Sequence, residues 1–202
     1  TARLSAAAAI LAGAIAVPMA APANAWTADV IANVDLTSTI KKLNQTTTFP
    51  RGQFTGVLDS DARTIVGKTA IPPATSQLKI GSLPLADVTI KIIPQGTSRT
   101  DISFDGWDWA LHTTQTVGLQ IVSLKPPGMP INMVGNYGKS AFTQTLDGRF
   151  PTTGTGPGTS DDYWETGTYT IPRFSNCGFL TTDIINLAIP GPGNMASVHF
   201  TR

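Results

Sequence analysis

Apolar and polar residues alternate along much of the chain, and a period of two is typical of strands that are buried on one face only. Three segments show the pattern most clearly, and in each the apolar positions share one parity: residues 30–40 (Val30, Ala32, Val34, Leu36, Ile40), residues 88–92 (Val88, Ile90, Ile92) and residues 196–201 (Ala196, Val198, Phe200). We predict a half-buried strand in each of them.

Turn signals separate these segments at intervals of about ten residues. Residues 48–54 and 125–130 contain proline and glycine and are predicted to be turns, and Pro94 to Gly96 ends the strand before it. A hairpin is expected around Ser60-Asp61. Short strands at 140–146 and 167–172 should flank a loop over 150–162. Many short strands with regular turns indicate a mostly β fold, an antiparallel β-sandwich or a barrel-like form.

The apolar parity changes once, near residue 106. Ile102 and Phe104 are even-numbered, whereas Trp107, Trp109 and Leu111 are odd-numbered, as are the apolar residues of 117–121. One extra residue in a strand turns all later side chains to the other face, and glycine is the usual residue at such a bulge. A β-bulge is therefore predicted at Gly106.

One short helix is expected near the C-terminus. Thr181 could cap it, Asp183 falls in the first turn, where the helix dipole favours an anion, and Ile184, Ile185 and Ala188 would form its apolar side. The run Pro-Gly-Pro-Gly that follows should end the helix after about two turns.

The first 25 residues have the three-part pattern of a secretory signal. Arg3 precedes an apolar run over residues 6–17, and prolines then precede a small-residue site that ends at Ala25. The run is too short for a membrane-spanning helix, which needs about 20 residues. We expect cleavage after Ala25, export to the cell envelope or medium, and a single folded domain over residues 26–202.

The composition narrows the class of partner. Of 14 basic side chains one, Arg3, lies in the leader, which leaves 13 basic against 13 acidic ones and a net charge near zero. Nucleic acids and anionic lipid headgroups both reward a basic surface, so neither is expected as a partner. Glu165 is the one glutamate, and the scarcity of helix-surface residues again favours strands.

Catalytic patterns are weak. The sequence has no Gly-x-Ser-x-Gly elbow, and both histidines, His112 and His199, fall on the parity opposite to the apolar residues. A glycosidase would need two opposed carboxyl groups. The candidates are aspartates whose spacing does not pair them: Asp101, Asp105, Asp108, Asp161 and Asp162. No metal or cofactor is predicted, and a non-enzymatic role is favoured over an aspartate-dependent hydrolase.

The segment "FDGWDW" is the most suggestive patch for ligand contact. Trp107 and Trp109 would share one strand face, where indoles can stack on sugar rings or line an apolar groove, with Asp105 and Asp108 beside them. The alternative is that both tryptophans fill the core, which is the more common fate of tryptophan on an apolar parity.

Cys177 is the one cysteine, and four roles are open to it: nucleophile, metal ligand, half of a disulfide, or buried small residue. No histidine or second cysteine lies at a motif spacing, which argues against catalysis and against zinc. An unpaired cysteine in an exported protein is either an inert buried residue, which we favour, or a thiol that bridges two chains.

The closing stretch "YTIPRFSNCGFLTTDIINLAIPGPGN", together with "IKKLNQTTTFPRGQFTG" and "KTAIPPATSQLKIGSLPLADV", resembles a group of small secreted actinobacterial proteins that have no assigned activity. The resemblance implies an exported β-rich domain. It also implies a second cysteine after a Val-Gly turn in mid-domain, where this chain has Tyr137 or a neighbour instead. On that basis Cys177 would be half of a bridge whose partner is missing.

Three functions follow from these expectations, in order of preference. The first is an exported, non-enzymatic envelope or extracellular protein that binds cell-wall or lipid components, as a monomer or a thiol-linked dimer. The second is a carrier that holds a lipid or small apolar ligand between two sheets, with Trp107, Trp109 and Leu111 lining the cavity. The third is a hydrolase that uses Asp105 and Asp108.

Overall fold

The computed structural model describes residues 25–80, 82–104, 108–134, 138–151, 162–178 and 181–201. Within them the chain forms eleven strands, a 3₁₀ turn and one α-helix. The elements are β1 (Thr27–Ile40), η2 (Lys41–Leu43), β2 (Gln45–Thr48), β3 (Gly52–Asp59), β4 (Thr64–Ala70), β5 (Ala74–Ile80), β6 (Leu83–Pro94), β7 (Ser98–Phe104), β8 (Asp108–Lys125), β9 (Gly138–Pro151), β10 (Asp162–Ile171), α2 (Thr181–Ala188) and β11 (Gly191–Thr201).

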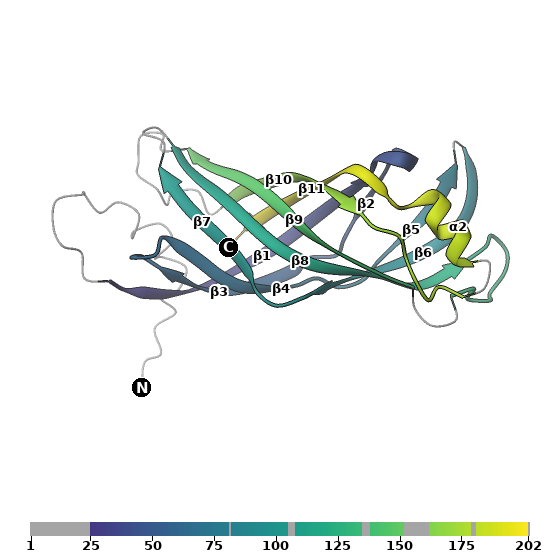
Figure 1. Ribbon diagram of the computed structural model, residues 1–202, viewed down its shortest axis with the longest axis horizontal. Coiled ribbons are helices and arrows are strands. Elements are labelled where there is room, and N and C mark those ends of the chain that lie inside the picture. The colour runs from purple at the N-terminus through teal and green to yellow at the C-terminus, as the bar shows by residue number, and fades with distance from the viewer. Residues whose placement is uncertain are drawn as a thin grey trace.

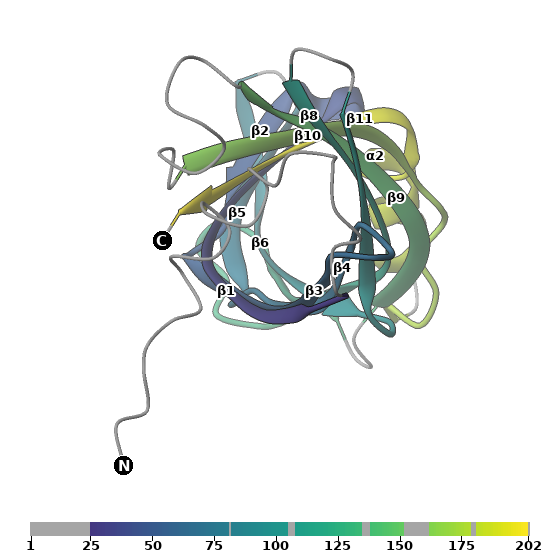
Figure 2. The same ribbon diagram turned by 90° about the vertical axis from the view of Figure 1, so that its left-hand side faces the viewer.

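Eight of the strands close into a ring. The pairing runs β8-β7-β4-β3-β1-β11-β10-β9, and β9 pairs with β8 from Asp108↔Pro151 to Ile121↔Gly138, which completes the circle. All the pairings are antiparallel, and the ring is visible when the molecule is seen along its length (Figure 2). A closed ring leaves no free sheet edge along its strands, so all eight strands have two neighbours.

The barrel is long because β8 changes partner along its length. Its first half pairs with β7 up to Arg99↔Thr114, and its second half pairs with β6 from Pro94↔Val117 to Asp87↔Lys125. β5 and β2 extend the same end, where β2 pairs with the last residues of β1. The side chain of Gln45 joins these two strands by hydrogen bonds to Ser76 and to the main chain of β5.

The alternation in the sequence sets which side chains face inward. In β1 the even-numbered Val34 and Leu36 are 0% and 5% exposed, whereas the odd-numbered Ile31 is 52% exposed. The same rule holds in β11, where Val198 is buried and Ser197 is only half-buried. The predicted strands and the hairpin around Ser60-Asp61 are therefore confirmed. The turn predicted over 48–54 is shorter than expected and covers only 49–51, because Thr48 ends β2 and Gly52 begins β3. The bulge expected at Gly106 lies outside the described residues.

The helix α2 confirms the predicted C-terminal helix, with two corrections. Asp183 is in the first turn and Ile185 and Ala188 are buried, but Ile184 is 46% exposed, because only one narrow side of so short a helix packs inward. Thr181 is the first helical residue, and its hydroxyl donates to the Met133 carbonyl at 3.0 Å instead of capping the helix.

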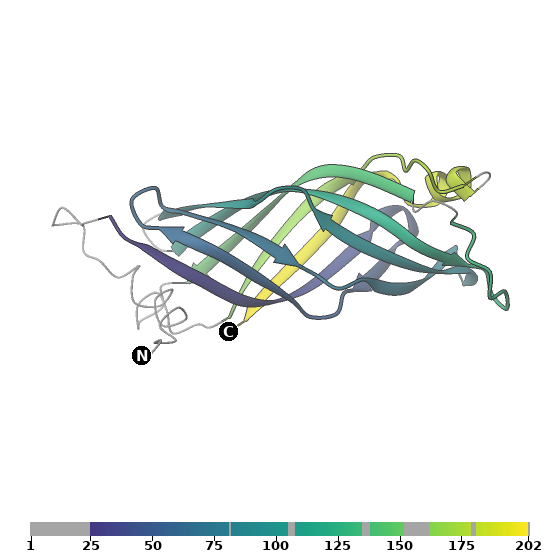
Figure 3. The ribbon, with the colours of Figure 1, turned by 90° about the horizontal axis from the view of Figure 1, so that it is seen from below.

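The helix end of the barrel is filled by apolar side chains. Phe174, Ile185 and Ile189 are all buried there, and the Asn186 side chain holds the segment before the helix in place by bonding both main-chain groups of Phe174, at 2.6 and 3.0 Å. α2 lies at the end of the molecule that also carries β5 and the start of β6 (Figure 3). The prediction of a mostly β fold, an antiparallel β-sandwich or a barrel-like form with one short helix near the C-terminus, is confirmed, and the closed ring shows that the form is barrel-like.

Candidate functional site

The interior of the ring contains a cavity of about 80 Å³. Most of its wall is apolar and comes from inward positions of β1, β6, β9 and β11, among them Leu36, Ile92, Phe142 and Val198. This volume is several times what one water needs, and about half of the ~150 Å³ that holds benzene in an engineered protein cavity. It suits a slender ligand.

Two stacked aromatic pairs strengthen the wall. The rings of Phe142 and Tyr169 are parallel within 2° with centroids 5.0 Å apart, and those of Tyr163 and Phe200 are parallel within 9° at 4.6 Å. Each pair joins side chains from neighbouring strands across the inner face of the barrel. Such pairs hold their side chains in place, since stacking contributes about 0.5–1.5 kcal/mol beyond the burial of area.

A short hydrogen-bonded chain of polar side chains interrupts the apolar wall. The hydroxyls of Thr100 on β7 and Thr113 on β8 are 2.7 Å apart, and Thr113 donates to Oε1 of Glu165 on β10 at 3.0 Å. All three residues line the cavity, and Glu165 is only 1% exposed. The barrel therefore carries a carboxyl group on its inside.

The position of Glu165 depends on the glycine opposite it. A Cβ on Gly148 of β9 would lie 2.8 Å from Cγ of Glu165 and 2.6 Å from the Trp164 carbonyl oxygen, so no larger residue fits there. Burial raises the pKa of Glu165 to about 7, the hydrogen bond from Thr113 opposes that rise, and the negative charge of Asp147 adds to it.

Two residues that line the cavity each have a buried side-chain atom without a hydrogen-bond partner among the described residues. One atom is Oε2 of Glu165, and the other is Nε2 of Gln115, a side chain that is 9% exposed and lies two residues beyond Thr113 on β8. Leaving a buried polar group unpaired typically costs about 1–3 kcal/mol. An apolar pocket with a few convergent polar groups is the usual form of a small-molecule site.

The structure places two of the predicted ligand-contact residues, Trp109 and Asp108, away from this cavity. Trp109 is half-buried near one end of the barrel, with its ring 4.9 Å from Phe104, and Asp108 points to the outer face, 4.0 Å from Arg149. Trp109 and Leu111 are not among the residues that line the cavity, and the cavity lies inside a ring and not between two sheets. Asp105 and Trp107 lie outside the described residues.

Of the aspartates that were candidates for hydrolysis, the described Asp101 and Asp108 are too far apart to form a pair. Asp101 forms a 2.9 Å ion pair with Arg99, and its register partner on β8 is His112, four residues from Asp108. Four residues of strand span about 14 Å, more than the ~5–9.5 Å between the carboxyls of glycosidases. Asp161 lies outside the described residues; Asp162 begins β10.

Both histidines lie on the outer face, as predicted. His112 is bonded to Asp147 at 2.7 Å, and His199 stacks on Trp164, with ring centroids 4.0 Å apart. Neither lines the cavity, so neither is near Glu165 on the inside of the barrel.

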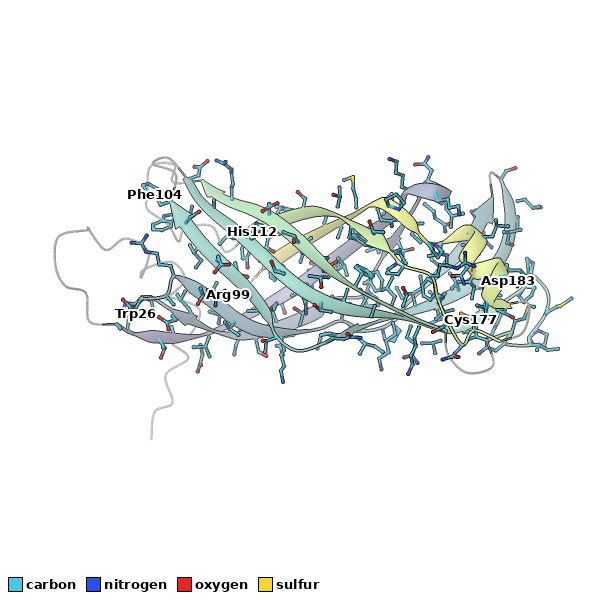
Figure 4. All side chains as sticks on the ribbon, viewed as in Figure 1. Trp26, Arg99, Phe104, His112, Cys177 and Asp183 are labelled. Carbon is cyan, nitrogen blue, oxygen red and sulfur yellow. The ribbon has the colours of Figure 1, made fainter. Side chains whose placement is uncertain are left out.

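Cys177 is free and 0% exposed, at the helix end of the barrel (Figure 4). It packs against Gly138: a Cβ on that glycine would lie 2.0 Å from the sulfur. Burial raises the pKa of the thiol. Tyr137, which the resemblance places where a second cysteine is expected, lies outside the described residues.

Comparison with known proteins finds no protein family, curated protein or solved structure that matches this chain. In the part of the chain that the structure describes, no group of three or more His, Cys, Asp or Glu side chains could hold a metal ion. Over the same residues, no helix has both the length and the apolar character needed to cross a membrane.

Sequence reasoning missed Glu165, although one signal for it was present. In the strand 162–171 the inward positions are odd-numbered, and Glu165 shares that parity with Tyr163, Tyr169 and Ile171. A carboxyl on the apolar parity of a strand is a candidate for a buried functional group, because charged residues are almost never fully buried without a partner.

Proposed function

We propose that the protein binds a slender, mainly apolar molecule inside its barrel and serves as a carrier or binding protein, exported by the N-terminal segment. One observation carries the proposal. The interior cavity is mainly apolar, and two of the polar residues that line it, Glu165 and Gln115, each have a buried side-chain atom without a hydrogen-bond partner among the described residues. A packed interior that served stability alone would gain by replacing these two side chains with apolar ones.

The test is native mass spectrometry of the protein secreted by an exporting bacterial host, under non-reducing conditions. We expect an adduct that is released by organic solvent and is mainly hydrocarbon in composition. In the variant Ala196→Leu the added carbon atoms would occupy the cavity, since Ala196 lines it, and the adduct should be lost. The matched control Ser197→Leu, which points outward from the same strand, should keep it.

Thermal unfolding followed by circular dichroism checks that both variants are folded. A bare chain in the unaltered protein, together with no uptake of added propane or 1-propanol, which are small enough for this cavity, would refute the proposal. A dimer that dissociates on reduction would show instead that Cys177 bridges two chains.

A second candidate function, attachment to a lipid surface of the cell envelope, is favoured by the helix end of the barrel. Six large apolar side chains there are exposed, namely Leu83, Met129, Ile131, Met133, Ile184 and Leu187, with exposed fractions from 39% to 73%. They come from the β5–β6 hairpin, the segment after β8 and α2, which lie together at that end (Figure 1). An exposed apolar patch of this kind marks an interaction site.

The charges around this patch fit an anionic bilayer. Among the described residues of that end, the exposed basic side chains Lys79, Lys125, Lys139 and Arg173 outnumber the exposed acidic Asp87 and Asp183. Each basic residue close to an anionic surface contributes about 1 kcal/mol. The expected attachment is therefore interfacial, with the patch inserted among the headgroups.

Sedimentation with vesicles tests this candidate. The protein should bind vesicles that contain phosphatidylglycerol more than vesicles of phosphatidylcholine alone, and Leu187→Asp should reduce binding. The control Ile31→Asp changes an equally apolar, exposed side chain on β1, far from the helix, and should have no effect. If Leu187→Asp and Ile31→Asp sedimented equally with the vesicles, attachment to a lipid surface through this patch would be refuted.

A further inference from the structure

The main-chain pairing around the barrel has one gap at the helix end. There the strands follow one another in the order β2-β1-β11-β10-β9-β8-β6-β5, and a main-chain ladder joins each strand to the next. The pair that would close this order is the exception, because among the described strands β2 pairs with β1 alone and β5 with β6 alone. We call the line between β2 and β5 the seam.

Prolines lie where the seam begins. β3 and β4 pair as far as Gln53↔Ala70. On one side the chain then reaches β5 through Pro72 and Pro73, and on the other side Pro50 lies between β2 and β3. Proline has no N–H to donate to a neighbouring strand, which accounts for the end of the ladder before β2 and β5.

One side chain of β2, that of Gln45, takes the place of the missing ladder. Its Nε2 donates to Oγ of Ser76 at 3.0 Å and to the Gln77 carbonyl, and its Oε1 accepts from the Lys79 N–H at 3.3 Å. A carboxamide has the donor and the acceptor of a peptide group, so this side chain bonds the main chain of β5 as a neighbouring strand would. The contact across the seam therefore depends on a single residue.

The seam lies beside the interior cavity. Thr47 of β2, Phe49 directly after β2 and Ile71 shortly before β5 all line the cavity, and the first two are 6% and 5% exposed. Parting β2 from β5 breaks the hydrogen bonds of one side chain, whereas parting two paired strands of the ring breaks a run of main-chain bonds. Opening is therefore easiest at the seam.

Resting on the function proposed above, we propose that the seam is the entrance through which a small apolar molecule reaches the cavity. The side chain of Gln45 holds the entrance closed, and its hydrogen bonds break when the molecule passes beside Thr47. β2 is the strand that moves, since four register pairs hold it to β1 and seven hold β5 to β6.

Labelling of thiols with methyl methanethiosulfonate, a small uncharged reagent, tests this in a Cys177→Ala background. Thr47→Cys places a thiol at the seam. Val198→Cys places one at a cavity position that is also 6% exposed, on a strand paired on both sides. Mass spectrometry should show that the seam thiol is labelled about tenfold or more faster than the Val198→Cys thiol.

A second change assigns the difference to Gln45. Gln45→Ala removes the bonds across the seam and should speed the labelling of Thr47→Cys about tenfold, with no change for Val198→Cys, whose labelling reports general unfolding. The control Thr39→Ala removes the 2.8 Å contact with the Thr46 hydroxyl, between β2 and its paired neighbour, and should change neither rate. Ile71→Cys replaces Thr47→Cys if that variant does not fold, and Gln45→Ala should speed its labelling likewise.

The outcomes separate the entrance from the function. Equal labelling of Thr47→Cys and Val198→Cys, or equal acceleration of both by Gln45→Ala, would refute the seam as the entrance. Fast labelling of Thr47→Cys that Gln45→Ala does not change would refute the role of Gln45. Uptake of propane or 1-propanol by the unaltered protein is an independent measurement, and if neither is taken up, interior binding itself fails whatever the labelling rates.

Discussion

The buried carboxyl of Glu165 should make the stability of the protein fall as pH rises. Its pKa is about 7 in the folded protein and close to the ordinary 4.5 in the unfolded chain, so the folded state binds the proton more tightly. A carboxyl whose pKa is raised by folding contributes stability that is complete below pH 4.5 and is lost as pH rises towards 7. Above pH 7 no more is lost.

The size of the effect follows from the two values. At 1.36 kcal/mol for each pH unit, the range from 4.5 to about 7 corresponds to about 3 kcal/mol, of which about 2.5 kcal/mol is lost between pH 5 and pH 8. Glu165→Gln cannot ionise and has nearly the same shape. The free energy of unfolding of the variant, relative to the unaltered protein, should therefore rise by that amount over this interval.

Urea unfolding at pH 5, 6, 7 and 8, followed by tryptophan fluorescence and circular dichroism, measures this difference. Taking the difference removes the contributions of groups common to both proteins, provided that both probes give the same transition. In Thr113→Val the hydrogen bond that holds the pKa down is absent, so the decline should extend above pH 7. A difference between Glu165→Gln and the unaltered protein that does not change with pH would refute the reasoning.

Three further predictions concern packing. Gly148→Ala should destabilise the fold by about 1–3 kcal/mol in urea unfolding, because the new methyl meets main chain, whereas Gly118→Ala, whose nearest neighbour is the end of a flexible side chain, should cost less than 1 kcal/mol. Because Cys177 is buried, its thiol should be alkylated by iodoacetamide only in urea, as measured by the mass of the protein, and rapid alkylation of the native protein would contradict this. Gly138→Ala should lower the free energy of unfolding less in a Cys177→Ala background, where the sulfur atom is absent. Asn186→Ala, which loses two buried hydrogen bonds, should lower stability by about 2 kcal/mol; an unchanged melting temperature would contradict it.

Much of the local structure could be predicted from the sequence. The alternation in 30–40 and 196–201, the turn at Ser60-Asp61 and the short helix from Thr181 all depend on neighbours within a few residues, where period and turn chemistry act directly. The exposure of Ile184 was not predictable, since the part of a short helix that is covered depends on which distant segments reach it.

The candidate site depended on contacts between distant parts of the chain. Glu165 and Thr113 are 52 residues apart, and Gly148, which leaves room for the carboxyl, belongs to a third strand. The tryptophans of "FDGWDW" drew attention because their side chains are large, yet Trp109 lies outside the cavity wall. Composition marks which side chains could bind a ligand and does not place them.

The sequence by itself determined that this chain is built from strands with one apolar face, because alternation and turn residues act locally. Only the tertiary structure decided that the strands close into a ring, because closure depends on the register between β8 and β9. Closure also decided the chemistry: it placed the single glutamate inside a mainly apolar interior, where burial raises its pKa and one of its oxygens has no hydrogen-bond partner among the described residues.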